Sequence, residues 1–310
     1  MRVRRRLARL LLHLLLVGLA LIWFTPTLGL LVSSFRPADQ IIRTGWWTVI
    51  LHPTQVRSFT LDNYRQVLAR EGMARAFLNS FLIAVPSTVI PITVAALAAY
   101  ALAWMKFRGR GVLLSVIIGL IVIPLQMTLI PVLKLFNFLK LSGTFPAVWL
   151  AHTGYGLPLI VYLLRNFFGA LPKELFESAF IDGASHFTAF TRLLLPLSVP
   201  VLASVAIFQF LWVWNDLLVA LVYLGGYSAV APLPLKLATL VGSRGQDWHL
   251  LTSAAFISMA VPLLVFFSLQ RYFVRGILAG ALKGCLKFAR LAPDLRRKEG
   301  KEAEGEIAGN

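Results

Sequence analysis

The segment ELFESAFIDGASHFTAFTRLLLPLSVP, residues 174–200, mixes charge with a regular apolar pattern, and apolar runs of membrane-spanning length flank it. Its apolar side chains recur every three or four residues, which is helical spacing. Asp182-Gly183 interrupts this pattern, and glycine commonly ends a helix in the left-handed conformation. Either Asp182 or Ser185 then stands where it can cap a second helix. The segment predicts two short helices joined at an angle, each with aromatic residues along it: Phe176, Phe180, Phe187 and Phe190.

The whole chain is too apolar for a soluble domain. Of its 310 residues, 58% are hydrophobic and only 14% are charged, whereas soluble domains carry about 25% charged residues. Since backbone polar groups must be satisfied inside the membrane, spans of this kind are helices. We expect an all-α polytopic membrane protein with six transmembrane helices. The charge-free runs, each longer than the ~20 residues that cross a bilayer core, are 10–35, 76–105, 111–133, 141–164, 193–215 and 250–270.

The net charge of +17 is better explained by membrane topology than by nucleic-acid binding. If both termini are cytoplasmic, 20 of the 30 Lys and Arg residues lie on the inner side. The opposite orientation would invert the positive-inside rule. No small-residue cleavage pattern follows the first apolar run, so we expect an uncleaved first span. Both termini are therefore predicted to be cytoplasmic, with no nucleic-acid partner.

Three regions are predicted along the chain. Residues 1–75 form a first span and an outward-facing segment, in which Trp46-Trp47 can anchor at the lipid interface. Residues 76–275 hold five further spans, and residues 276–310 form a cytoplasmic tail whose charged end is predicted to be disordered.

Proline, alanine and glycine positions predict how these spans are shaped. Pro86 and Pro91 should kink the second span. Its alanine-rich second half, residues 95–103, suits close helix packing. Gly154, Gly156 and Pro158 predict a broken or closely packed fourth span. A short helix is expected near Asp62 in the outward-facing segment.

Common catalytic and nucleotide-binding motifs are missing from the sequence. It contains no phosphate-binding G-xxxx-G-K-[ST] loop, no H-E-xx-H and no G-x-S-x-G. Cys285 is the single cysteine, and the five histidines are scattered without ligand spacing. We expect no catalytic residue, no metal site and no cofactor bound by this chain.

Few strongly polar side chains lie inside the predicted spans. Asp216 is the only acid within an apolar run, and such an acid should face a polar interior or lie near a membrane boundary. Twenty residues beyond Pro196, at about 1.5 Å each, bring it near the outer boundary, so a headgroup-level acid and a hydroxyl acceptor on a solute path both stay open. Trp212 and Trp214 suit stacking on sugar rings. The solute-path candidates are Asn79, Gln126, Gln209, Asn215 and Asp216.

The central segment resembles the EAA loop of permease subunits in ABC importers, which reads E-A-A, three residues, G, nine residues, I-x-L-P. Ser178 and Leu193 replace the first Ala and the Ile, and the rest of the spacing matches. In that family the loop is the coupling helix that docks into the ATPase subunit. The resemblance implies ATPase-docking residues within 174–196: Glu177, Ser178, Ala179, Asp182, Gly183, Phe187, Leu195 and Pro196.

Other stretches extend this resemblance. FLWVWNDLL (210–218) and RYFVRGILAGALKG (271–284) are similar to the maltose-type second permease subunit, and the segment around Trp46-Trp47 is similar to alpha-glucoside members. The resemblance implies the ABC importer permease fold and a multi-pass bacterial inner-membrane protein that imports a di- or oligosaccharide. It also implies several partners besides the lipid bilayer: a second homologous permease, two ATPase subunits that bind ATP-Mg and an extracytoplasmic sugar-binding protein.

Four alternatives stay open. The central segment also fits an ordinary amphipathic loop in the lipid interface. A secondary transporter usually has ionisable partners deep in the membrane, whereas only Asp216 is available here. A scaffold that recruits a cytoplasmic protein is disfavoured by the kinking prolines. An importer of another solute, such as phosphate, also fits, because specificity can reside in the binding protein and the partner permease.

Overall fold

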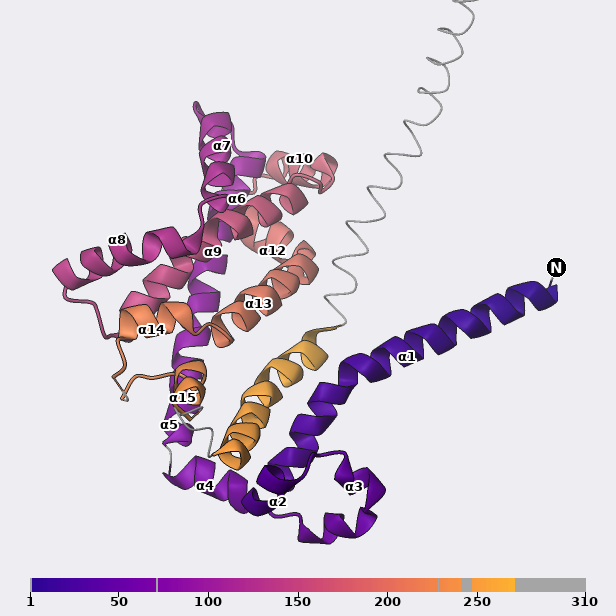
Figure 1. The fold of residues 1–310 in the computed structure, drawn as a ribbon. Helices are drawn as coiled ribbons and strands as arrows, with labels where there is room; N and C mark the ends of the chain where they lie inside the picture. Colours follow the sequence, from indigo (N-terminus) through magenta and orange to yellow (C-terminus); the bar gives the residue numbers. More distant parts are fainter. Residues whose placement is uncertain (1, 71, 228, 241–246, 271–310) are drawn as a thin grey trace, which may run out of the picture. The chain divides into compact units, whose positions relative to one another are not determined.

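The computed structural model describes residues 2–70, 72–227, 229–240 and 247–270, which are helical apart from their connecting segments (Figure 1). The predicted tail 276–310 and the stretch 271–284 lie outside the described residues. The helix Trp248–Gln270 follows the last labelled element. The labelled helices are α1 (Arg2–Phe35), α2 (Ala38–Arg43), α3 (Thr48–Leu51), the 3-10 helix η1 (Pro53–Ser58), α4 (Asp62–Arg70), α5 (Met73–Ala84), α6 (Pro86–Trp104), α7 (Arg110–Ile121), α8 (Leu125–Phe138), α9 (Phe145–Phe168), α10 (Lys173–Ile181), α11 (His186–Thr188), the π-helical turn η2 (Ala189–Leu194), α12 (Leu195–Leu197), α13 (Val199–Trp214), α14 (Leu218–Leu224) and α15 (Leu233–Leu240).

Helices of membrane-spanning length match the apolar runs of the sequence. Four are long and apolar enough to cross a bilayer: Arg9–Phe35, Met73–Trp104, Phe145–Phe168 and Trp248–Gln270. Two bent pairs, α7 with α8 and the helices of His186–Leu197 with α13, bring the number within the described residues to six if each pair is one span. The predicted all-helical fold with up to six spans is therefore confirmed.

Prolines account for the breaks in the bent pairs. Pro124 precedes α8 with an extended backbone (φ −63°, ψ 128°), so the helical hydrogen bonds of α7 do not continue into α8. The second pair bends by 75° beside Ser198. Pro200, two residues later, has no N–H to donate back to the preceding turn. The fourth predicted span, by contrast, is one unbroken helix, α9.

The described chain divides into two compact units. The first comprises residues 1–87, 124–153 and 210–264. Within it, Asn63 of α4 donates to the carbonyl oxygens of Ser34 and Arg36 at the end of α1, and Ser253 donates to that of Ser34. The segment that follows α1 and the helix Trp248–Gln270 are thereby attached to one end of α1. The short helix predicted near Asp62 is confirmed as α4.

The second unit comprises residues 88–123, 154–209 and 265–310. Its core joins the small face of α6 to the second half of α9 and to the segment α10–η2. Ala95 and Ala99 are fully buried, so the predicted close packing of the alanine-rich stretch is confirmed. Leu164 and Phe168 of α9 complete this core at 0% exposure.

Candidate functional site

The segment α10–α12 has the two-helix geometry that its sequence predicts. Helix α10 ends at Ile181, and Gly183 adopts the left-handed conformation with φ +84°. Ser185 then caps α11, because its Oγ accepts a hydrogen bond from the N–H of Thr188 at 3.2 Å. Of the two residues predicted to cap the second helix, Ser185 is confirmed. Asp182 is instead the C-cap of α10. We call residues 173–197 the central loop.

Aromatic contacts fix the central loop to the core of its own unit. Phe176 is fully buried and stacks on Trp104 of α6, with 3.9 Å between ring centroids. Phe190 is also buried and lies edge-on to Tyr100 of α6 at 5.4 Å. The Tyr100 hydroxyl lies 2.9 Å from Nδ1 of His186, which adds a polar contact. Both halves of the loop therefore pack against α6.

Other side chains of the central loop project away from this core. Ile181 is 85% exposed and Phe187 is 72% exposed. Glu177 and Asp182 are exposed beside them. Exposed large apolar residues rimmed by acids are typical of a surface that binds another protein. Ile181 was not predicted from sequence, although its position next to Asp182-Gly183 could have marked it as a residue at the turn.

The π-helical turn η2 was also not predicted. It runs from Ala189 to Leu194, just before the Leu195-Pro196 pair of the loop motif. A π turn widens the helix locally, and such turns are frequent at functional sites. Here Ala189, Phe190 and Leu194 are all buried. Of the remaining predicted loop residues, Ser178 and Pro196 are exposed and Ala179 and Leu195 are half-buried.

The solute-path candidates are divided between the two units. Gln209 belongs to the second unit and is 5% exposed. A Cβ on Gly156 of α9 would lie 2.6 Å from its Oε1, so the amide packs directly on that glycine. Close packing, one of the two outcomes predicted for the glycines of α9, is therefore observed at Gly156.

Asn79, in the first unit, holds a neighbouring segment in place. Its amide donates to the carbonyl oxygens of Ala229 and Ala231, each at 3.0 Å. The next residue, Ser80, accepts a hydrogen bond from the N–H of Leu233 at the start of α15. These bonds satisfy backbone groups of residues 229–233. Both Asn79 and Ser80 are buried, which favours a structural role for them.

Asp216 lies in the first unit, in the break between α13 and α14. Its Oδ2 accepts hydrogen bonds from the N–H groups of Val219 and Ala220 at 2.9 and 3.3 Å. The same oxygen is 3.9 Å from Nε2 of His152, which is 1% exposed. The carboxylate therefore caps the first turn of α14 by accepting from its free N–H groups, and it also faces a buried imidazole. His152 is not among the residues predicted from sequence, since it has no metal-ligand spacing, but its place within the charge-free run 141–164 is a signal for a buried polar side chain.

The two tryptophans beside Asp216 have different environments. Trp212 is 37% exposed and lies edge-on to His152, with 5.2 Å between ring centroids. Trp214 is 1% exposed, and its indole donates to the carbonyl oxygen of Ser258 at 3.1 Å. The expectation that both could stack on a sugar is therefore wrong for Trp214, which is a core residue. Asn215 and Gln126 are exposed, and the amide of Asn215 donates to the carbonyl oxygen of Leu211.

Comparison with known proteins identifies relatives over most of the chain. Residues 75–279 match the family described as binding-protein-dependent transport system inner membrane component. The osmoprotective compounds uptake permease protein of Synechocystis sp. is 62% identical over 271 residues, which cover 87% of this chain and 91% of that protein. The alpha-glucoside transport system permease protein of Rhizobium meliloti is 44% identical, covering 88% and 96%.

Solved structures provide a match in fold. A chain of a bacterial ABC transporter involved in import of the acidic polysaccharide alginate has a TM-score of 0.69 and 19% sequence identity. The match covers 86% of this chain and 97% of that chain. The alginate transporter in complex with a periplasmic protein bound to alginate pentasaccharide matches with a TM-score of 0.63 and 16% identity.

Proposed function

This chain belongs to the family of inner membrane components of binding-protein-dependent transport systems, and we propose that it forms half of the solute path of an ATP-driven sugar importer. The chain is a multi-pass membrane protein with the fold of an ABC importer permease. In the proposed importer, a second, homologous permease supplies the other half of the path. ATP-Mg binds to two separate ATPase subunits, and a sugar-binding protein delivers the solute from outside.

The geometry of the central loop is the observation that carries this proposal. Phe176 and Phe190 pack it against α6, while Ile181 and Phe187 project outward beside Glu177 and Asp182. One face can therefore bind a partner while the other transmits its movement to a membrane span. A partner groove with apolar walls and a basic residue opposite Glu177 would complement the exposed face. We assign this groove to the ATPase subunit.

The sugar as solute is supported by the relatives. Their names specify osmoprotective compounds and alpha-glucosides, and a further relative at 32% identity is a trehalose transport system permease protein of Mycobacterium tuberculosis. We propose a di- or oligosaccharide, with alpha-glucosides as the first candidates to test. In the first unit, Trp212 offers an aromatic face beside Asp216 and His152, a combination suited to a hydroxyl-rich solute.

The position of the central loop supports the proposed orientation in the membrane. Trp104, at the end of α6, stacks on Phe176, so the basic turn 105–109 lies at the same end of the second unit as the loop. Lys and Arg concentrate on cytoplasmic turns, and the ATPase acts in the cytoplasm. We propose that this end of the unit, together with both termini, faces the cytoplasm.

Uptake of labelled solutes tests the function. A bacterial strain lacking this chain, and the same strain expressing it with its natural partners, are given radiolabelled trehalose, maltose or phosphate. We expect the chain to restore uptake of at least one alpha-glucoside and to leave phosphate uptake unchanged. Restored phosphate uptake without sugar uptake would favour the alternative importer class and contradict the sugar assignment.

A further inference from the structure

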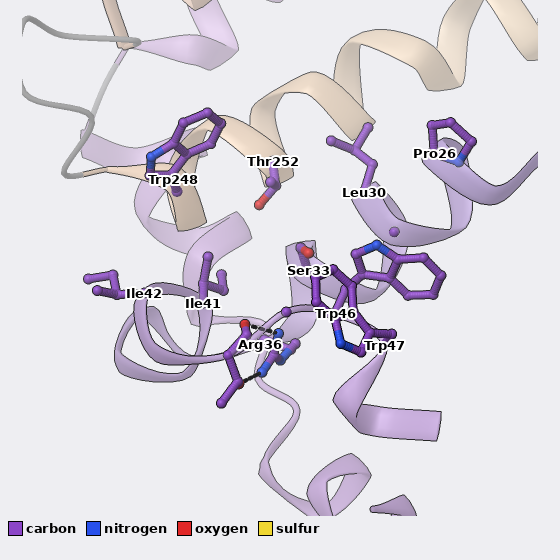
Figure 2. Close-up of a pocket in the computed structure, with 13 residues that line it drawn as sticks. Pro26, Leu30, Ser33, Arg36, Ile41, Ile42, Trp46, Trp47, Trp248 and Thr252 are labelled. Atoms are coloured by element: carbon purple, nitrogen blue, oxygen red, sulfur yellow. Dashed lines mark hydrogen bonds between the residues drawn. The ribbon is translucent and has the colours of Figure 1, made fainter. Parts of the chain in front are cut away.

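A cavity of about 670 Å³ lies within the first unit, where α1 meets the outward-facing segment. Figure 2 shows the side chain of Trp248 on one side of it and those of Trp46 and Trp47 on the other. The indole of Trp46 lies directly against α1, because a Cβ on Gly29 would be 2.6 Å from its Nε1. The three indoles therefore line the cavity where the candidate spans Arg9–Phe35 and Trp248–Gln270 meet the segment that follows α1.

The cavity lies at the end of a candidate membrane span. Pro26, Gly29, Leu30 and Ser33 line it from one face of α1, within the last turns of the span Arg9–Phe35. Nine residues at about 1.5 Å each separate Pro26 from the end of that span. With the end of the span at the headgroup level, the cavity reaches roughly 13 Å toward the hydrocarbon region. An occupant that is apolar at one end and polar at the other fits this position.

The turns of α1 that precede the cavity expose apolar side chains. Leu21, Ile22, Trp23 and Phe24 do not line the cavity and are between 52% and 83% exposed. A span with such side chains outward contacts acyl chains unless a partner covers it.

The polar end of the cavity favours an anionic group. Arg36 lines it and is 1% exposed. Its terminal nitrogens donate to the carbonyl oxygen and the hydroxyl of Thr44 (Figure 2). One of them also donates to the carbonyl oxygen of Gln40. Its buried Nε, however, has no hydrogen-bond partner among the described residues. Arg43, at the end of α2 between two lining residues, is exposed, and none of the described lining residues is acidic.

We propose that this cavity is a binding site for one phospholipid. Its acyl chain lies against Pro26, Leu30 and the indoles, which are preferred at this depth of a bilayer. Its phosphate lies near the positive charges of Arg36, which lines the cavity, and of the exposed Arg43. The bound lipid fills the space between α1, Trp47 and Trp248 and holds the outward-facing segment against the membrane. The site does not depend on which solute the protein carries.

Native mass spectrometry of the purified complex tests this proposal. The detergent-washed complex is titrated with phosphatidylglycerol, and separately with inorganic phosphate and with trehalose. We compare wild type with Trp47→Ala, which removes an indole, and with Leu30→Trp, which fills the cavity. Trp23→Ala is the matched control, because Trp23 is on α1 and 83% exposed but does not line the cavity.

We expect one tightly retained phospholipid per copy of this chain in wild type and in Trp23→Ala. Occupancy at a fixed lipid concentration should fall by roughly tenfold in both cavity variants, as expected for losing an aromatic contact or the space itself. Neither inorganic phosphate nor trehalose should displace the lipid. Wild type without a retained phospholipid, equal retention in Leu30→Trp and wild type, or displacement by trehalose would each overturn the assignment. The wild-type arm decides the question even if a variant does not assemble.

Discussion

Replacing Gly183 with valine should disconnect the central loop from its ATPase while leaving the permease in the membrane. Gly183 has φ +84° at the bend between α10 and α11. No atom lies within 4 Å of the position that its Cβ would occupy, so a side chain meets open space. The cost of the substitution therefore comes from the backbone alone and not from a clash.

That backbone cost can be bounded. An L residue in the left-handed region is disfavoured by roughly 1–2 kcal/mol, with β-branched residues at the upper end or above. Such a penalty lowers the ratio of bent to unbent loop about 5- to 30-fold. If docking selects the bent loop, the apparent affinity for the ATPase falls by up to the same factor. Gly183→Asn should be nearly normal, because Asn tolerates this conformation.

Gly109 supplies a matched control. It has φ +85° before α7, and its Cβ position is likewise free of neighbours. Gly109→Val therefore imposes the same backbone strain in the second unit, outside the central loop. The assay is co-purification of the ATPase from membranes, followed by ATP hydrolysis stimulated by the loaded binding protein. Normal co-purification and normal stimulated hydrolysis in Gly183→Val would refute the coupling role, and equal defects in Gly109→Val would show a general effect of strain.

Three further predictions follow from the same geometry. Phe187→Ala should change the free energy of unfolding by less than about 0.5 kcal/mol but reduce ATPase co-purification. Phe176→Ala should destabilise the chain by about 3–5 kcal/mol in thermal unfolding. A larger destabilisation by Phe187→Ala than by Phe176→Ala would contradict the assignment of inner and outer faces. Asp216→Asn should keep the bonds to α14 but lower sugar uptake through loss of charge; normal uptake, with a defect only in Asp216→Ala, would make this residue a helix cap. Cysteines placed at Arg57 and Lys298 in a cysteine-free chain should be labelled from opposite sides of the membrane, and labelling from one side would contradict the topology.

Much of the fold is encoded locally and could be predicted. Long charge-free runs indicate spans because water and hydrocarbon impose different costs on charged groups. The bend at Gly183 and the cap at Ser185 follow from the intrinsic conformational preferences of these residue types. The burial of the alanines of α6 could be predicted, because small side chains allow neighbouring helices to approach closely. The close packing at Gly156 of α9 could not be predicted, because the residue that packs on it, Gln209, is far away in the sequence.

The candidate site was predicted less completely. The four phenylalanines of the central loop follow helical spacing, yet Phe176 and Phe190 point inward while Phe187 points outward. The bend at Gly183 and the widened turn η2 rotate the second helix, so spacing along the chain no longer reports which face is buried. The approach of His152 to Asp216 is a long-range contact, and only the folded first unit brings the two residues together.

We propose that transport through this chain is driven by ATP hydrolysis in a partner subunit, and reconstitution measures this coupling. The complex is placed in proteoliposomes with ATP-Mg on the side of the ATPase and the binding protein with labelled alpha-glucoside on the other. An ionophore collapses all ion gradients. We expect ATP-dependent sugar accumulation that persists with the ionophore and is lost in Gly183→Val. Accumulation that needs an ion gradient and proceeds without ATP would contradict ATP-driven transport and favour a secondary transporter.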